Sequence, residues 1–471
     1  MEEVTIDNIR KTYFGDRAFY RHVIVIALPM ILQNLITNFV TMLDNIMVGQ
    51  VGTAEMSGVS IVNQFIFVFH ITLFGGMSGA SIFGTQFFGK RDHEGQRYTV
   101  RFRLYLAAAL VAAGCFIFST CGTQLIRLFL SDADAPEKID ATLGFGRQYM
   151  DIMMLSLIPF SFGQVYASAL NECGETKVPM YGAMSAVGLN LVLDYVLIFG
   201  KCGFPVLGVR GAAWATLIAK SVEAAVMVLY AHRHIGRFAF LKGLYSSPVI
   251  PRSLNLKIIH RGLPLLFNEF LWSLSMSVIA QCYSVRGIDV VAARNIASTL
   301  NNLFSVVFVQ LGTSTGIIVG ALLGAGELEK AVSDSRKLRV FSVWSTFLLG
   351  GVMIPLAYWF PQIYNTEPEI RSLAGFFILI QATSMPFWAY TNSCYFTLRC
   401  GGKTGVTFLF DFLFSWAVMI PLCAVLVYCT ALDVRLIFAL VTFSEAIKAV
   451  IGWLMVRSRI WVNVLVEDGS V

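Results

Sequence analysis

The sequence predicts an all-α integral membrane protein, with twelve transmembrane helices in two pseudo-symmetric six-helix bundles. Composition, hydropathy and an internal repeat all support this fold class. The chain of 471 residues is 56% hydrophobic and 14% charged, whereas soluble domains carry about 25% charged residues. Mean hydropathy is +0.69. Apolar stretches long enough to cross a bilayer, about 20 residues each, recur along nearly the whole chain.

The internal repeat relates the two halves of the chain at a constant offset. With Pro29 aligned on Pro264, Gly89 falls on Gly324, and several residues between them also match. A duplicated apolar unit of this size is typical of membrane transporters built from two repeats. Six helices in each half is an even number, so the repeats should lie parallel and be related by an axis along the membrane normal, with a substrate path between them.

Hydropathy divides the chain into two lobes. The N-lobe covers residues 23–232, and the C-lobe covers 258–471 and ends in a short cytoplasmic tail. Residues 1–22 are a polar N-terminal segment, and 233–257, the longest polar interruption, is the expected linker between lobes. The expected spans are 23–49, 58–88, 98–121, 143–170, 178–200, 207–232, 258–285, 292–323, 338–362, 372–398, 405–430 and 433–457.

The distribution of lysine and arginine predicts the orientation. If the N-terminus is cytoplasmic, 24 of the 35 basic residues lie in or beside cytoplasmic segments and 8 lie in or beside outer loops. The positive-inside rule therefore places both termini in the cytoplasm of a multi-pass protein of the cell (inner) membrane. The first 22 residues are polar and basic, unlike a cleavable signal.

Several function classes are excluded. The net charge of +6 belongs to charges that flank membrane spans, so we expect no nucleic-acid partner. Nine cysteines occur without CxxC pairs, which favours packing over disulfides or metal ligands. There is no nucleotide-binding loop, no HExxH motif and no nucleophile with paired His and Asp, so an enzyme is not expected and no residue is assigned as catalytic.

Four short motifs carry a family resemblance. They are LDNIMVG at 43–49, QFFGKRD at 86–92, NLVLD at 190–194 and GAAWAT at 211–216. In this order, with the Pro-to-Gly pattern of both repeats, they resemble the multidrug and toxic compound extrusion (MATE) family, bacterial type. The resemblance covers almost the whole chain. It implies two six-helix lobes, antiport driven by protons or sodium, and export of amphipathic, often cationic compounds.

Carboxylates inside the N-lobe spans are candidates for ion coupling. An ionised Asp at mid-membrane costs on the order of 3 kcal/mol by insertion scales, so it usually serves a function. Asp44 lies in span one, and Asp194 lies in span five on one helix face with Asn190. Lys220 is the nearest in-span base, but Glu223 is a further acid. At least one carboxylate is therefore expected to hold a proton or a metal cation.

The resemblance gives these residues roles. In the branch that includes archaeal and DinF-like members, the acids matching Asp44 and Asp194 bind the coupling ion. Asn190 matches an amide ligand, Thr216 a further polar position and Pro29 the proline at which span one bends. The implied ion is H⁺ or Na⁺, and Asp44 and Asp194 would be metal ligands only in the sodium case. No other cofactor is expected.

The C-lobe offers fewer acids. Other family branches place the ion in spans seven, eight and ten, but here span ten has no acid and span eight has none in its core. Glu269 in span seven lies where the first repeat has Asn34. It either meets a cationic substrate in the central cavity, or it is a hydrogen-bonded structural acid. Asn34 and Tyr149, which loosely matches a family tyrosine of span four, are further cavity candidates.

Several of these groups also have a structural interpretation. Helix ends, neighbouring charges and packing each account for an ionisable side chain without a transport role. These interpretations are a helix cap or bonds to Asn45 and Gln50 for Asp44, self-neutralising i,i+3 pairs for Lys220–Glu223 and Glu445–Lys448, a solvated helix-start acid for Asp411, and a packed, hydrogen-bonded residue, in place of a proton relay, for His70.

The leading functional hypothesis is an ion-coupled multidrug exporter, a monomer whose partners are a small amphipathic molecule and the lipid bilayer. The alternative is a flippase or exporter of lipid-linked oligosaccharide or lipid from the same superfamily. Phosphate-bearing substrates would require several cavity arginines or lysines, and spans one, two, five and seven have no basic residue before their terminal loops. A membrane scaffold or receptor is a third possibility, but it would not explain why an acid such as Asp44 occurs in only one of the two repeats.

Overall fold

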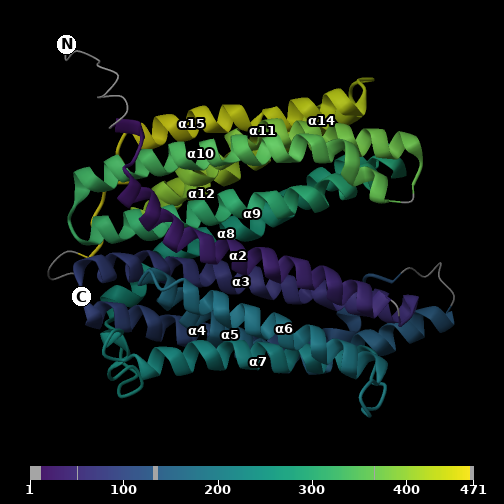
Figure 1. Ribbon diagram of the computed structural model, residues 1–471, viewed down its shortest axis with the longest axis horizontal. Helices are drawn as coiled ribbons and strands as arrows, with labels where there is room; N and C mark the ends of the chain where they lie inside the picture. The colour runs from purple at the N-terminus through teal and green to yellow at the C-terminus, as the bar shows by residue number, and fades with distance from the viewer. Residues whose placement is uncertain (1–11, 50, 131–135, 365, 467–471) are drawn as a thin grey trace. The chain divides into compact units, whose positions relative to one another are not determined.

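The computed structural model describes residues 12–49, 51–130, 136–364 and 366–466, without the side chains of 40–46, 49, 53, 138 and 288. The described chain is built from long α-helices (Figure 1). They are α2 (Arg17–Gly49), α3 (Thr53–Lys90), α4 (His93–Arg127), α5 (Pro136–Glu172), α6 (Lys177–Phe199), α7 (Val209–Arg233), α8 (Arg252–Ser284), α9 (Ile288–Gly324), α10 (Leu328–Trp359), α11 (Pro368–Cys400), α12 (Thr404–Leu413), α13 (Ile420–Tyr428), α14 (Val434–Phe443) and α15 (Glu445–Arg457).

Short segments join or interrupt these helices. Two are 3₁₀ turns, η1 (Ala239–Leu241) after α7 and η2 (Phe360–Ile363) after α10. The third, η3 (Phe414–Met419), is a π-helical segment between α12 and α13. Single π segments inside α-helices are frequent at functional sites, because the extra residue re-aims neighbouring side chains.

The predicted all-α membrane fold is confirmed. Within the described residues, eleven helices are long and apolar enough to cross a membrane. The predicted twelfth span, 433–457, is formed by α14 and α15, which are separated only at Ser444. This residue keeps helical backbone angles, with φ −57° and ψ −22°.

Contacts divide the chain into two compact units. Unit 1 comprises the described parts of Met1–Ala27, Thr85–Asp92 and Leu256–Val471, and unit 2 comprises Leu28–Gly84 and His93–Asn255. Helices α2 and α3 each contribute residues to both units, because contacts and not chain order define this grouping. The lobe and linker boundaries expected from membrane topology stay predictions.

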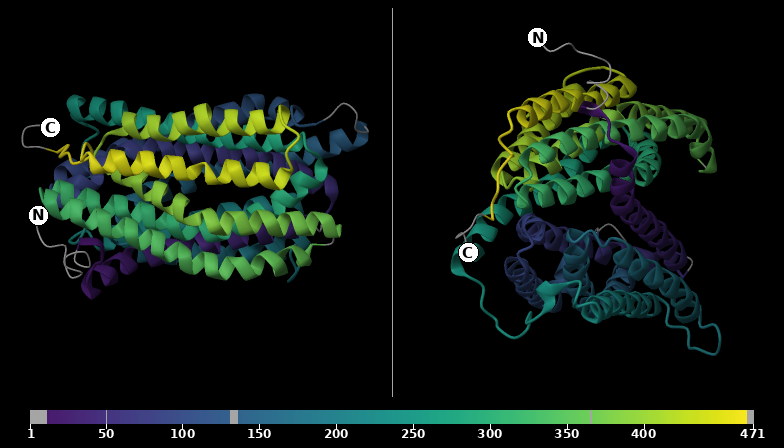
Figure 2. Two further views of the ribbon diagram at one scale, coloured as in Figure 1. Left: turned by 90° about the horizontal axis from the view of Figure 1, so that it is seen from above. Right: turned by 60° about the vertical axis from the view of Figure 1, so that its left-hand side comes forward.

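Each unit has its own apolar core. In unit 2, α4 packs against α5, α6 packs against α7, and α5 packs against α7. In unit 1, α11 is central and contacts α9, α10, α14 and α15. The long helices of unit 1 run nearly parallel to one another when seen from above (Figure 2). Lipid supplies no hydrophobic drive between helices, so close packing holds such bundles together.

The repeat-equivalent glycines Gly89 and Gly324 meet at the ends of α3 and α9. A Cβ on Gly89 would collide with the carbonyl of Ala321, and a Cβ on Gly324 would collide with the carbonyl of Gln86. Gln86 and Ala321 are also equivalent at the same offset, so this contact has two-fold pseudo-symmetry. Glycine is required here because only a residue without a side chain permits this backbone approach.

The side chain of Gln86 holds the C-terminal tail in unit 1. Its amide nitrogen donates to the carbonyls of Cys400 and Asn463, at 3.0 and 3.2 Å. Its amide oxygen accepts from the backbone nitrogen of Leu465 at 2.7 Å. Trp461 of the tail is only 1% exposed. The tail after α15 is therefore an ordered part of the unit up to Val466.

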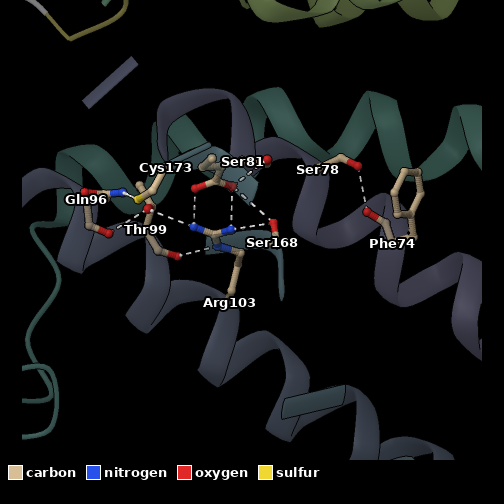
Figure 3. A network of polar contacts seen from close by, with 9 residues as sticks. Phe74, Ser78, Ser81, Gln96, Thr99, Arg103, Ser168 and Cys173 are labelled. Carbon is tan, nitrogen blue, oxygen red and sulfur yellow. Dashed lines mark hydrogen bonds and ion pairs between the residues drawn. The ribbon is translucent and has the colours of Figure 1, made fainter. Parts of the chain in front are cut away.

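A buried ion pair joins three helices of unit 2 (Figure 3). The Arg103 guanidinium of α4 donates to both carboxylate oxygens of Glu172 in α5, at 2.6 and 2.9 Å. The hydroxyls of Ser81 and Ser168 also donate to this carboxylate. The two charged side chains are 0% and 2% exposed. Bidentate geometry and full hydrogen bonding are the conditions under which a buried pair is tolerated.

The predicted linker is packed and not loose. Phe238, Phe240 and Leu244 are buried against the core of unit 2. The Arg101 guanidinium of α4 donates to the carbonyls of Gly243, Leu244 and Val249, at 2.6, 2.8 and 3.0 Å. A single arginine thus donates to three backbone carbonyls of a segment that is largely without the regular backbone hydrogen bonds of a helix or sheet.

Replacing Arg101 by alanine should loosen this linker. Three carbonyls lose a charged donor, so we expect a destabilisation of about 2 kcal/mol and faster tryptic cleavage at Lys242. Thermal unfolding and limited proteolysis of the purified protein measure both effects. Arg97→Ala is the matched control, because within the described part of the chain Arg97 donates to a single carbonyl, that of Phe240, at 3.2 Å. Equal cleavage rates for the two variants would contradict the assignment.

Candidate functional site

Asp194 and Asn190 lie one turn apart on α6 and are both buried. Asp194 is 1% exposed and Asn190 is 6% exposed. Helix spacing of four residues puts their side chains on one face. The Asn190 amide nitrogen has no hydrogen-bond partner among the described residues. Buried polar groups normally have hydrogen-bond partners. A buried amide with an unpaired donor, one turn from a buried carboxylate, is therefore a candidate polar site within the membrane helices.

The structure describes less of the other predicted coupling residues, Asp44 and Thr216. Asp44 belongs to α2, but its side chain lies outside the described residues, as do those of Asn45 and Gln50. Thr216 of α7 is partly buried, and its hydroxyl donates to the carbonyl of Ala212 at 3.0 Å in its own helix. The lone pairs of that hydroxyl remain acceptors.

Pro29 lies inside α2, at the division between the two units. Ala27 is the last residue of α2 grouped with unit 1, and Leu28 is the first grouped with unit 2. A proline inside a helix removes one backbone hydrogen bond and crowds the preceding turn. The proline of α2 therefore lies within two residues of the point at which the helix passes from one unit to the other.

Among the described residues, the ammonium of Lys220 in α7 pairs with the carboxylate of Glu223. The ammonium lies 2.8 Å from the Glu223 carboxylate, and the side chain of Glu223 is 7% exposed. This is the self-neutralising i,i+3 pair expected from the sequence. The ammonium also lies 5.7 Å from the ring centre of Phe160, on which His70 stacks with ring centres 3.8 Å apart. The ring of His70 is packed, as its structural interpretation required.

The predicted cavity residues of unit 2 are engaged in local contacts. Tyr149 of α5 is 5% exposed and donates its hydroxyl to the amide oxygen of Asn63 in α3, at 3.2 Å. Asn34 of α2 donates to the carbonyl of Met30 one turn earlier, at 3.0 Å. Neither contact tests a role in substrate binding. Both roles stay predictions.

Glu269 of α8 belongs to a hydrogen-bonded chain inside unit 1. Tyr395 of α11 donates to the Glu269 carboxylate at 3.2 Å. The amide nitrogen of Asn268 donates to the Tyr395 hydroxyl at 3.3 Å and to the Asp411 carboxylate at 3.0 Å. Lys448 of α15 donates to the other Asp411 oxygen at 2.6 Å. The chain of donors therefore runs across α8, α11, α12 and α15.

Two expectations about this region are wrong. Asp411 is not a solvated helix-start acid, since its side chain is 13% exposed and it is ion-paired with Lys448. Glu445 and Lys448 do not form an isolated pair, because Lys448 lies 2.6 Å from Asp411 and 3.7 Å from Glu445. In both cases the cause is a neighbouring helix, α12 or α15, that packs beside the residue in three dimensions.

Sequence reasoning missed Asn268 and Tyr395 as members of this chain. Both are ordinary polar residues of apolar helices, and only the packing of α8 against α11 and α12 joins them. No group of three or more His, Cys, Asp or Glu suited to hold a metal ion occurs in the described part of the chain.

Comparison with known proteins decides the family. The family model described as MatE matches residues 29–196 and 264–425, more than half of the chain. The chain belongs to the MATE family. Its two matched stretches begin at Pro29 and Pro264, the same residues on which the internal repeat is aligned. The protein is therefore a membrane transporter and not an enzyme.

Relatives and solved structures agree with this membership. The protein is 24% identical over 410 residues to the probable multidrug resistance protein NorM of Thermotoga maritima, covering 86% of this chain and 85% of that one. It is also 24% identical over 421 residues to the probable multidrug resistance protein YoeA of Bacillus subtilis, covering 88% of each chain. A crystal structure of MATE in the bent conformation superposes with a TM-score of 0.83 at 18% identity, over 97% of this chain and 98% of that one.

Removing the ammonium of Lys220 tests the pairing in α7. Lys220→Met leaves the Glu223 carboxylate buried without its cation, which should cost roughly 3–5 kcal/mol of stability. Adding Glu223→Gln to the same protein removes the uncompensated charge and should recover most of that loss. Thermal unfolding in detergent measures both variants. If Lys220→Met alone is as stable as the parent, Glu223 does not depend on this ammonium.

Proposed function

We propose that this MATE transporter is a secondary active multidrug efflux protein of the bacterial cell membrane. In this role it exports amphipathic or cationic compounds in exchange for H⁺ or Na⁺. Support comes from the relatives named multidrug resistance proteins, which match over 85–88% of their own lengths. The observation that carries the ion coupling is the burial of Asp194 to 1% exposure beside Asn190 on α6.

The coupling site combines Asp44 and Asp194 with the oxygen atoms of Asn190 and Thr216. A carboxylate in apolar surroundings strongly prefers its protonated form, and a bound cation favours its ionised form, so proton and sodium compete for one position. Through this competition, a proton or sodium gradient can change the protonation and ion occupancy of the N-lobe carboxylates. Coupling arises because the ion binds one conformation of the lobe more tightly than the other.

The moving element of this proposal is α2. Its proline, Pro29, coincides with the division between the two compact units. One solved MATE structure is named for a bent conformation. In the proposed cycle, ion uptake favours a bend of α2 near Pro29, and that bend narrows the path available to the bound compound. Glu269, Asn34 and Tyr149 remain the candidate contacts to that compound.

Replacing Asp194 by asparagine should abolish ion-driven efflux. The amide keeps the size of the carboxyl group, but it cannot exchange a proton and has no negative charge to balance a bound cation. We expect efflux of a fluorescent cation from proteoliposomes to fall to the level of protein-free vesicles, with pH and sodium gradients imposed separately. Asp44→Asn should behave in the same way.

Asp151→Asn is the matched control for this experiment. Asp151 is a membrane-region acid of α5, but its side chain is 49% exposed and pairs with Arg147 at 2.9 Å. It should leave efflux unchanged. Undiminished ion-driven efflux in both Asp44→Asn and Asp194→Asn would refute the coupling assignment. A parent protein that moves lipid-linked sugars but no drug would favour the flippase alternative.

The native cysteines test the proposed orientation. Cys202 follows α6 and Cys429 follows α13, both are exposed, and both should face outward if the termini are cytoplasmic. A membrane-impermeant maleimide should therefore label both in intact cells. Burial raises the pKa of the Cys173 thiol to about 12, so this thiol, which follows α5, should stay unlabelled even after lysis.

A cytoplasmic reporter completes the orientation test. Ser246 of the linker is exposed, and Ser246→Cys in a protein lacking Cys202 and Cys429 should react only after the cells are opened. Labelling of Ser246→Cys in intact cells, with Cys202 and Cys429 protected there, would reverse the orientation.

A further inference from the structure

Two lysines in the membrane helices face different numbers of acids. Lys220 of α7 pairs with one carboxylate, Glu223, at 2.8 Å. Lys448 of α15 pairs with two, Asp411 at 2.6 Å and Glu445 at 3.7 Å. The side chains of Lys448, Asp411 and Glu445 are 8%, 13% and 1% exposed. One ammonium therefore serves two buried carboxylates in unit 1.

Counting charges shows that this cluster is one positive charge short. With both acids ionised, the three groups carry a net charge of −1. Widening the count to the rest of the hydrogen-bonded chain changes nothing, because it adds one acid, Glu269, and one nearby cation, Arg399. A net charge shut away from water is far more costly than a neutral cluster. A proton on one of the two acids removes it.

The amide of Asn268 beside Asp411 can adapt to a proton on that acid. Asn268 is 2% exposed, and its amide nitrogen donates to Asp411 at 3.0 Å. Its amide oxygen is buried and has no hydrogen-bond partner among the described residues. After a half-turn of the amide this oxygen could accept from a protonated Asp411, because carboxylic acids donate and carboxylates do not, and the amide nitrogen would then give up its bond to Asp411.

We propose that Asp411 and Glu445 share one exchangeable proton, which makes this cluster a second proton site in unit 1. In the observed arrangement the proton is on Glu445, because Asp411 has the shorter contact to Lys448 and the additional donor Asn268. Glu445 keeps one close donor, the hydroxyl of Thr391 at 2.8 Å. Its place in the first turn of α15 favours ionisation, but this effect is small beside a buried net charge.

The alternative arrangement exchanges the partners. With the proton on Asp411, Lys448 turns to Glu445, and the Asn268 amide turns so that its oxygen accepts from Asp411.

The groups around Asp411 and Glu445 come from three α-helices and the π-helical segment η3. They are Asn268 and Glu269 on α8, Thr391, Tyr395 and Arg399 on α11, and Phe410 on α12 and Phe414 at the start of η3, whose rings lie 5.3 and 5.6 Å from the Lys448 ammonium.

Helix irregularities lie next to both acids. The π-helical segment η3 begins three residues after Asp411, and the α14–α15 break at Ser444 immediately precedes Glu445. Discontinuous membrane helices are where transporters place ion sites, since free backbone groups and adjustable side chains are available there. A proton moving between the acids would shift Lys448 between α12 and α15, which gives unit 1 a two-state element.

Infrared difference spectroscopy of the full-length protein in lipid nanodiscs tests this site without transport. A carboxylic acid and a carboxylate have separate carbonyl bands, and neither amide replacement has them. Subtracting Glu445→Gln from the parent should show the loss of one carboxylic acid and no change in carboxylates. Asp411→Asn should give the same result, because Glu445 then ionises against Lys448. Either variant suffices if the other fails to fold.

Glu223→Gln is the matched control, since Glu223 also pairs with a lysine at i,i+3 spacing, and no second acid pairs with that lysine among the described residues. Its difference spectrum should show the loss of one carboxylate and no carboxylic acid. The proposal is overturned if Glu445→Gln and Asp411→Asn each remove only a carboxylate. It is also overturned if replacing choline chloride with sodium chloride removes the acid band, which would indicate a sodium site. The measurement is independent of the ion coupling proposed for Asp44 and Asp194.

Discussion

A charged side chain inside a membrane bundle needs an opposite charge or a proton, and the polar structure of this protein follows from that need. Arg103 and Glu172 are matched one to one and bidentate at 0% and 2% exposure. Lys220 and Glu223 are matched one to one at 2.8 Å. Where buried carboxylates outnumber the neighbouring cations, the low dielectric favours protonation of one carboxylate. Such clusters are therefore where the protein can exchange ions.

The backbone is regular except where polar groups or close helix contacts require otherwise. Gly89 and Gly324 permit α3 and α9 to approach through their backbones, each against the equivalent part of the other repeat. The irregular points of α12–α13 and α14–α15 lie beside Asp411 and Glu445. Pro29 interrupts the hydrogen bonding of α2 at the division between the units. The close backbone contact of the glycines and the irregular turns thus lie at different positions along the helices.

Local information in the chain was sufficient for some conclusions and not for others. Pro29 and Pro264 could be paired from sequence because duplication preserves spacing, and the family match begins at both residues. The Lys220–Glu223 pair was predictable because i,i+3 neighbours meet on any helix. Asp411 was misjudged, since its distance from the helix start suggested water, while its partner lies 37 residues away in α15.

The sequence by itself determined the all-α membrane class, the duplicated plan and the MATE resemblance, because hydrophobic length, basic residues and repeat spacing are properties of the chain alone. Only the tertiary structure decided which buried charges share partners. Asn268, Tyr395, Asp411 and Lys448 come from four separate helices, and their chain of contacts exists only after those helices pack. Sequence spacing determines neighbours within a helix, whereas packing determines neighbours between helices.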